Sequence, residues 1–247
     1  MDQLNIQPVL NEHALLIKDK KILVIADLHI GIESELRQLG LNAPSQTNKM
    51  AERLITLLEK LKPETIILLG DIKHNIPTST IGERYDVKKF LSQIDNRVSI
   101  HILPGNHDGN IQRLISSDVS LHSSDGVVIE EIGFVHGHRW PNKEVMNCKT
   151  VIIGHTHPTI MLTDRLGYKT FEPCWLKGKC FSNILEERYP ESKNPEIIVV
   201  PAFNIICGGI AVNKESIIGP FNKIVDVNNS EVYLSDGSSL GKVKNIK

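Results

Sequence analysis

The chain of 247 residues is long enough for one large domain or two small ones, and its formal net charge of -1 argues against a protein that coats nucleic acid through charge alone. Its four cysteines are too few for a disulfide framework in a chain of this length, so we expect free thiols in a reducing compartment. The N-terminal residues have neither the basic nor the apolar segment of a secretory signal, and no apolar run approaches the roughly 20 residues that cross a bilayer, so we expect a cytoplasmic protein that does not enter membranes.

Strand and helix patterns alternate along the first half of the chain. Short apolar runs indicate strands, and apolar residues three and four apart indicate helices. Pro63 is a helix stop, and Ser45 is a candidate cap for the helix that Pro63 ends. This alternation, with strands apolar throughout, predicts a parallel sheet covered by helices. The expected elements are a hairpin at 14–26, an irregular segment at 30–44, helices within 45–61 and 87–94, and strands at 65–69 and 98–103.

Beyond Asp118 the pattern changes to short strands separated by Gly, Pro and Asn, which predicts a second, mixed sheet. The chain shows no internal repeat, long linker or low-complexity tract. We therefore expect one domain over residues 1–247, with a motif-bearing core at 14–215. The expected strands cover 119–122, 127–130, 132–135, 150–153, 159–163, 197–200 and 224–227.

Side chains that can bind a metal ion follow five of the predicted strands. The segment 103–109 is the most informative, because a Pro-Gly turn presents an amide, an imidazole and a carboxylate directly after a strand. Ligands of open α/β sheets gather beyond the carboxyl ends of strands, and side chains two apart in an extended chain point the same way, so each such pair can hold one ion. One motif can arise by chance, but five in succession predict a metal site. The residues are Asp27 and His29, Asp71, Asn106 and His107, His136, and His155 and His157.

In order, these motifs are D-x-H, G-D, G-N-H-D, H-G-H and G-H-T-H, and they span residues 27–157. The set resembles the calcineurin-like metallophosphoesterases. The resemblance implies a four-layer α-β-β-α sandwich of two mixed sheets, a hydrolase acting on phosphate esters, and two divalent metal ions at the strand ends. It implies one ion held by Asp27, His29, Asp71 and His157, and another held by Asp71, Asn106, His136 and His155.

The resemblance also implies roles beside the metals. His107 would stand next to the scissile phosphate with Asp108 orienting it, and Asp71 would bridge the two ions. Two ions roughly 3.5–4 Å apart can clamp a phosphate and activate water near neutral pH. Imidazole, carboxylate and amide ligands suit Mn, Fe, Co, Ni or Zn without distinguishing among them, and manganese is the expected metal.

Three further polar residues lie in or next to the motifs. Many relatives have G-D-x-x-D or G-D-x-x-N where this chain has G-D-I-K-H, so His74 either contacts the substrate or a metal-bound water, or supports the preceding aspartate. His138 would lie on the same face as His136 in an extended chain and is expected to support the ligands. Arg139 is a candidate for contact with the phosphate. The alternative is that its side chain is solvated on the surface, which is more common for arginine.

A narrower resemblance extends toward the C-terminus. It rests on G-D-I-K-H, F-V-H-G-H, G-H-T-H-P, Pro201-Ala202-Phe203 and Gly208-Gly209. These segments are similar to the SbcD-related archaeal phosphoesterases and to the bacterial phosphoesterases encoded beside a DNA ligase and helicase. That similarity implies phosphodiesterase activity and DNA-repair partners. We do not expect a double-strand-break nuclease, because no segment remains for the capping domain and ATPase-binding tail of those enzymes.

Together these observations predict a metal-dependent phosphodiesterase that hydrolyses nucleotide or nucleic-acid phosphodiester bonds with metal-activated water. One alternative is a phosphomonoesterase acting on small molecules. Another is a non-catalytic scaffold on the same fold, which would be expected to lack His107 or one of the ligands. The near-neutral charge predicts that only a short nucleic-acid segment or a nucleotide is bound. The sequence leaves open the natural substrate, the metal, the polarity of cleavage and whether the chain forms a homo-oligomer.

Overall fold

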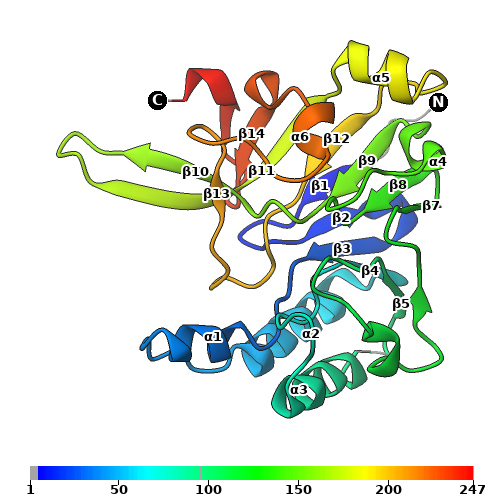
Figure 1. Ribbon diagram of the computed structural model, residues 1–247, viewed down its shortest axis with the longest axis vertical. Coiled ribbons are helices and arrows are strands. Elements are labelled where there is room, and N and C mark those ends of the chain that lie inside the picture. The colour runs from blue at the N-terminus through cyan, green and yellow to red at the C-terminus, as the bar shows by residue number, and fades with distance from the viewer. Residues whose placement is uncertain (1–4, 95, 247) are drawn as a thin grey trace.

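The computed structural model describes residues 5–94 and 96–246, and it places two β-sheets face to face between two groups of helices (Figure 1). One outer layer contains α1 (Ile32–Gln38), α2 (Thr47–Leu61) and α3 (Ile81–Ser92). The opposite outer layer contains α4 (Lys143–Met146), α5 (Ser182–Arg188) and α6 (Phe221–Ile224). This arrangement confirms the predicted α-β-β-α sandwich of two mixed sheets.

The first sheet consists, in spatial order, of β1 (Ile6–Pro8), β2 (Leu15–Ile17), β3 (Ile22–Ala26), β4 (Thr65–Leu69), β5 (Ser99–Ile102) and β6 (Ser120–Leu121). As predicted, β3, β4 and β5 run parallel, and β2 pairs with β3 as a hairpin. Ala26 lies opposite Leu69 in this register. The residues that follow β3 and β4 therefore leave the sheet at the same edge.

The second sheet runs through β13 (Ile210–Ala211), β10 (Pro158–Thr163), β11 (Lys169–Lys179), β12 (Glu196–Val199), β9 (Thr150–Ile153), β8 (Ile132–Val135) and β7 (Val127–Ile129). In addition, β14 (Glu231–Leu234) pairs with β11, and β15 (Ser239–Lys242) pairs with β14. The pairs β8–β9 and β9–β12 are parallel, whereas β10 and β11 form an antiparallel hairpin that projects from the body of the molecule (Figure 1). Val135 lies opposite Ile153, so the residues after β8 and β9 also leave at one edge.

Apolar side chains fill all three spaces between the layers. On β3, Leu23 and Ile25 pack toward the helices α2 and α3, while Val24 and Ala26 pack against the second sheet. Both faces of this strand are therefore buried, which explains why its sequence is apolar throughout rather than alternating. A third cluster, which includes Ile153, packs the outer face of the second sheet against α4, α5 and α6.

Two predicted segments have a different structure. Residues 30–44 were expected to be irregular, but α1 forms there and its Glu33 accepts the backbone N–H of Gln46 at 2.5 Å. A strand was expected at 224–227, but one helical turn ends at Ile224 instead. Phe221 and Ile224, three residues apart, are both fully buried on the same side of that turn, so burial in the helical layer outweighs the strand propensity of the apolar run.

Shorter features agree more closely with the sequence. The helix expected after Ser45 begins at Thr47 and ends at Leu61, two residues before Pro63, but its N-cap is Gln46 rather than the predicted Ser45. All four cysteines are free thiols. Within the described residues, every helix is too short or too polar to cross a bilayer. The 3-10 segments are Lys18–Lys20, Ile111–Arg113, Val227–Asn229 and Val243–Asn245.

Candidate metal centre

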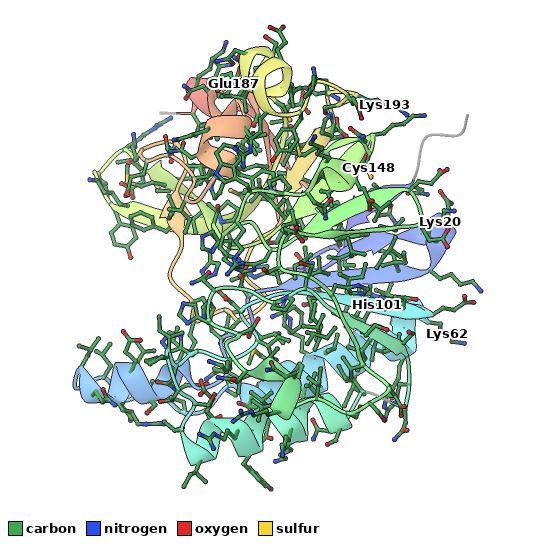
Figure 2. All side chains as sticks on the ribbon, turned by 45° about the vertical axis from the view of Figure 1, so that its right-hand side comes forward. Lys20, Lys62, His101, Cys148, Glu187 and Lys193 are labelled. Carbon is green, nitrogen blue, oxygen red and sulfur yellow. The ribbon has the colours of Figure 1, made fainter. Side chains whose placement is uncertain are left out.

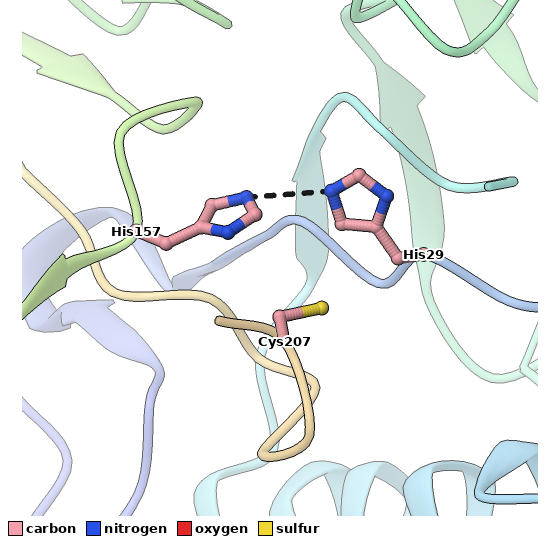
Figure 3. Close-up of side chains that lie close together, drawn as sticks. All are labelled: His29, His157 and Cys207. Atoms are coloured by element: carbon pink, nitrogen blue, oxygen red, sulfur yellow. Dashed lines mark hydrogen bonds between the residues drawn. The ribbon is translucent and has the colours of Figure 1, made fainter. Parts of the chain in front are cut away.

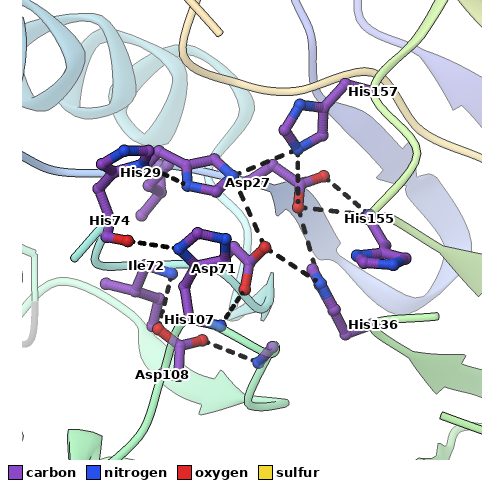
Figure 4. Close-up of polar contacts among 12 residues, drawn as sticks. Asp27, His29, Asp71, Ile72, His74, His107, Asp108, His136, His155 and His157 are labelled. Atoms are coloured by element: carbon purple, nitrogen blue, oxygen red, sulfur yellow. Dashed lines mark hydrogen bonds and ion pairs between the residues drawn. The ribbon is translucent and has the colours of Figure 1, made fainter. Parts of the chain in front are cut away.

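The polar residues that follow β3, β4, β5, β8 and β9 meet in one place between the two sheets (Figure 4). Hydrogen bonds join the loops directly: the backbone N–H of Asp27 donates to Gly70 O at 3.1 Å, and that of His29 donates to Asp71 O at 2.7 Å. The second sheet is joined to the first by the backbone N–H of His155, which donates to Asp27 Oδ2 at 3.1 Å. The predicted convergence of the motifs is therefore confirmed in space.

Five of the predicted ligands have a left-handed backbone rather than the extended one that the sequence argument assumed. Their φ angles are 57° at Asp27, 41° at His29, 48° at Asp71, 69° at His155 and 46° at His157. Non-glycine residues rarely adopt this region, and where they do, the surrounding fold holds them there. As a result His155 and His157 do not form one pair: His155 joins Asp71 and His136, and His157 joins His29.

The first group of candidate ligands is formed by Asp27, His29 and His157. His157 Nε2 lies 3.3 Å from Asp27 Oδ1 and 3.3 Å from His29 Nε2, and His29 Nε2 lies 3.6 Å from Asp71 Oδ2. Two donor atoms bound at about 2.0–2.1 Å in tetrahedral geometry are about 3.3 Å apart. These side chains therefore fit a single divalent ion among them.

The second group is formed by Asp71, His136 and His155, whose ligand atoms lie within 4.8 Å of one another. His136 Nδ1–H donates to Leu69 O at 2.7 Å, so Nε2 is left to face Asp71 Oδ2 at 3.4 Å. His136 is fully buried, and within the described part of the chain its Nε2 has no hydrogen-bond partner. A buried polar atom without a partner is costly, and a bound ion would satisfy it.

Asp71 lies between the two groups. Its Oδ1 accepts the backbone N–H of His107 at 2.8 Å, while its Oδ2 faces both His29 and His136. One carboxylate oxygen is thus directed toward both candidate ion positions, which is the arrangement that a bridging ligand requires.

The electrostatics of the centre suit cation binding. Burial lowers the pKa of His29 to about 3 and that of His155 to about 4, so both rings are neutral and have lone pairs to donate. Burial would raise the pKa of Asp71, but its contact with His136 outweighs burial and holds that pKa well below its usual range. Burial opposes protonation of His136 as well, yet its contacts with Asp71 and Asp27 raise its pKa to about 9. In this arrangement a proton on His136 partly offsets the buried carboxylates, and a metal ion would replace it.

His74 contacts a candidate ligand rather than Asp71. Its Nε2–H donates to Glu35 Oε2 at 2.5 Å, and its Nδ1 lies 3.2 Å from His29 Nδ1. With Nε2–H donated to Glu35, the Nδ1 of His74 accepts from His29, and the His29 Nε2 lone pair is left for an ion. His74 therefore orients a metal-binding imidazole, as hydrogen-bond partners of ligating histidines commonly do.

The surroundings of His107 differ from the expectation that Asp108 orients its ring. His107 Nδ1–H donates to the carbonyl oxygen of His74, and the two rings stack with centroids 5.4 Å apart. Asp108 is buried and accepts backbone N–H groups of Gly105 at 2.8 Å and Ile72 at 2.9 Å. Burial raises the pKa of Asp108 to about 6. Asp108 thus joins the β4 and β5 loops, and it positions His107 only through the backbone.

The remaining predicted residues lie at the margin of the centre. His138 is half-buried, with its ring centroid 5.2 Å from that of His136, and burial lowers its pKa to about 4. Asn106 and Arg139 are exposed, so their predicted roles rest on the motifs. Lys73, a cation of the same loops, is fully buried and donates to Asn75 O at 2.6 Å.

One metal-capable residue was not predicted. Cys207 lies in a group with His29 and His157, within 4.8 Å (Figure 3). Burial, followed by the charges of Asp27 and Asp71, raises the pKa of its thiol. The sequence feature that could have pointed to Cys207 is its position directly before Gly208 and Gly209, two residues on which the narrower family resemblance rests.

Comparison with known proteins agrees with this geometry. The sequence profile described as "Calcineurin-like phosphoesterase" matches residues 20–200. The chain belongs to the calcineurin-like phosphoesterase family. It is therefore a hydrolase of phosphate esters, and the family implies divalent metal ions, which the two groups of candidate ligands fit.

Two solved structures are similar to this phosphoesterase. Nuclease MPE of Pseudomonas putida is 21% identical, with 96% of this chain and 100% of that chain covered, at a TM-score of 0.58. Yfce, a phosphoesterase from E. coli, is 14% identical, with 90% and 97% covered, at a TM-score of 0.39. The first similarity extends the shared fold over nearly the whole chain.

Proposed function

We propose that this phosphoesterase is a dinuclear phosphodiesterase acting on nucleotides or on a short segment of nucleic acid. The observation that carries the proposal is the position of Asp71 Oδ2, which faces His29 Nε2 at 3.6 Å and His136 Nε2 at 3.4 Å. The proposed ligands of one ion are Asp27, His29, Asp71 and His157, and those of the other are Asp71, Asn106, His136 and His155. Manganese is the proposed metal for these nitrogen and oxygen donors.

In this proposal the bound ions and the side chains around them have different roles. Two bound divalent ions supply a charge clamp for the phosphate and lower the pKa of water, which provides the nucleophile. His107 donates Nδ1–H to His74 O, so Nε2 is its free ring nitrogen, and a proton carried there would stabilise charge on the phosphoryl group or pass to the leaving oxygen. Asp108 fixes the loop that carries His107 through its hydrogen bonds to Gly105 and Ile72.

The small number of positively charged side chains near the metal centre favours a diester substrate over a monoester substrate. A monoester dianion favours additional positive groups beside the phosphate, yet Lys73 is buried and bonded to Asn75 O. Arg139 is exposed and is the remaining candidate among the motif loops. Hydrolysis of an alkyl diester expels an alkoxide, which is a poor leaving group, and a protonated imidazole such as that of His107 would supply its proton.

Two further parts of the proposal concern the substrate and the location of the enzyme. The similarity to a nuclease of Pseudomonas putida supports a nucleic-acid substrate, and the narrower motif resemblance supports a role in DNA repair. Four free thiols suit the reducing cytoplasm.

The test compares kcat/KM on bis-p-nitrophenyl phosphate and on p-nitrophenyl phosphate, with the protein loaded with Mn, Co, Ni, Zn or Mg. We expect faster hydrolysis of the diester, and faster hydrolysis of the mono-ester would favour a phosphomonoesterase instead. His101→Ala is the matched histidine control, because His101 bonds to His122 at 2.8 Å on the flank of the first sheet (Figure 2).

The DNA part of the proposal is tested by measuring affinity against salt concentration with metal-loaded His107→Ala protein. We expect contacts to about one to three phosphates, with a slope of about -0.9 per phosphate for duplex DNA. A slope equivalent to about six or more phosphates would contradict binding of a short segment and favour an extended nucleic-acid track.

A further inference from the structure

The loop at residues 201–209 runs from β12 toward β13 along one side of the metal centre. The backbone N–H of Phe203 donates to Ala26 O at 2.8 Å, and Asn204 Nδ2 donates to Leu28 O at 2.9 Å. Asn204 is almost fully buried. The loop is thereby bonded to the segment after β3 that carries the first two candidate ligands.

The far end of the same loop is bonded to His157. His157 Nδ1–H donates to Gly208 O at 2.9 Å, and the backbone N–H of Ile210 donates to His157 O at 3.1 Å. A Cβ at Gly209 would overlap His157 O, so the loop can approach this closely only with glycine there. The donated Nδ1–H also leaves His157 Nε2 free to face the ion position.

Cys207 is the residue that this loop places between the two candidate imidazoles (Figure 3). Its Sγ and a ring nitrogen of both His29 and His157 lie within 4.8 Å of one another, and the two Nε2 atoms are 3.3 Å apart. For a tetrahedral ion with Zn–N of about 2.05 Å and Zn–S of about 2.3 Å, nitrogens are about 3.3 Å apart and nitrogen and sulfur about 3.6 Å. The two nitrogens already have the required separation, and the sulfur is at most about 1.2 Å farther from each than an ion held by all three would require.

Two other cysteines, unlike Cys207, donate a hydrogen bond from their sulfur atoms. Cys148 Sγ–H donates to Glu144 O at 3.6 Å, and Cys180 Sγ–H donates to Pro195 O at 3.8 Å. Among the described residues Cys207 Sγ has no hydrogen-bond partner, and it is half-buried. Its sulfur is thus available to an ion without loss of a hydrogen bond.

We propose that Cys207 Sγ is a ligand of the ion bound by Asp27, His29 and His157. The inference rests on the dinuclear site proposed above and deepens it, because it makes the two positions chemically different. The thiol proton is released to solvent when the thiolate binds the ion. Thiolate favours Zn, Fe or Co over Mn or Mg, whereas the position of Asp71, His136 and His155 has no sulfur donor. The two positions therefore select different metals.

Cobalt spectroscopy tests the proposal on the full-length protein. Co²⁺ is added to metal-free wild type, Cys207→Ser and Cys148→Ser, the last a control at the opposite end of β9 from His155 (Figure 2). We expect a near-ultraviolet thiolate-to-cobalt absorption band in wild type and Cys148→Ser that Cys207→Ser lacks, with the visible cobalt bands kept by all three. Two results would overturn the proposed role of Cys207 but leave the dinuclear site standing. One is a wild-type spectrum that has the visible cobalt bands but lacks the thiolate band, and the other is a thiolate band that is still present in Cys207→Ser. Failure of every variant to bind cobalt would overturn the dinuclear site as well.

Metal affinity gives a second readout that a purely packing role would not reproduce. We expect Cys207→Ser to lower affinity for Zn²⁺ by about tenfold or more, and affinity for Mn²⁺ by less than about threefold. Equal losses for the two metals, in protein with an unchanged circular dichroism spectrum, would contradict a sulfur ligand and indicate that Cys207 only fills space.

Discussion

A single methyl group at Gly105 tests the contact between the β4 and β5 loops. The Cβ of Gly105→Ala would lie 2.5 Å from Asp71 N and 2.8 Å from Asp71 Cγ, and closer still to Asp71 Oδ1. Ordinary contacts between such atoms begin near 3.5 Å, so the two loops must separate by about 1 Å. Asp71 Oδ1 accepts the His107 backbone N–H and Asp108 Oδ2 accepts that of Gly105, so this movement displaces both the proposed bridge and His107.

We expect Gly105→Ala to lower kcat/KM by about 10²-fold, the cost of a displacement of about 1 Å in an active site, and to destabilise the fold by about 1–3 kcal/mol through overpacking. The assays are diester hydrolysis, metal content and thermal unfolding. Gly82→Ala is the matched control, because a Cβ there meets no atom within 4 Å and Gly82 lies in α3, where alanine stabilises by up to about 1 kcal/mol. A folded Gly105→Ala protein with full metal content and near-normal turnover would refute the reasoning.

Three further predictions concern the metals and the proposed acid. Asp71→Asn should abolish turnover and weaken both ions, whereas Asp27→Asn should mainly weaken one, as counted by metal analysis; two ions and a near-normal rate in Asp71→Asn would contradict the bridge. His107→Ala should keep its metals and lose about 10²–10⁴ in kcat relative to His101→Ala, and loss of metal from His107→Ala would show a ligand role instead. Removal of metal by a chelator should lower the melting temperature by about 5–10 °C for each of the two proposed sites, relative to protein with metal at 100 times its Kd, because binding stabilises the fold by about 2.7 kcal/mol per site. An unchanged melting temperature after complete metal removal would mean that binding and folding are not coupled.

The left-handed residues of the centre explain part of its sequence. Gly70 has φ +72°, and a Cβ there would come within 2.7 Å of Gly105 N and of His136 Cγ, so the turn into Asp71 requires glycine. Asp71 itself has φ 48°. Backbone in this region costs of order 1–3 kcal/mol per residue and persists where the surrounding structure holds it. We infer that this strained backbone is retained because it directs the side chains toward a bound cation.

The sequence by itself determined the parallel strands and the polar residues that end them. Strands such as β3 and β4 are apolar throughout because both faces are buried, so a local run of residues predicts them. Short motifs after those strands were equally local, and the shared edge of a parallel sheet brings Asp27 and Asp71 together without further information. His136 follows β8 of the second sheet, so it joins them only through the packing of the two sheets.

Only the tertiary structure decided how individual side chains are used. The spacing of His155 and His157 favoured one shared ion, whereas the left-handed backbone that the contacts of two sheets maintain separates them, as the family resemblance implied. Asp108 bonds to the backbone of the neighbouring loop rather than to His107, because burial between two loops offers it several N–H groups. Cys207 lies 50 residues beyond His157, and no periodicity links such positions. Its place beside the candidate ligands follows from hydrogen bonds between distant segments, which exist only after the two sheets have packed together.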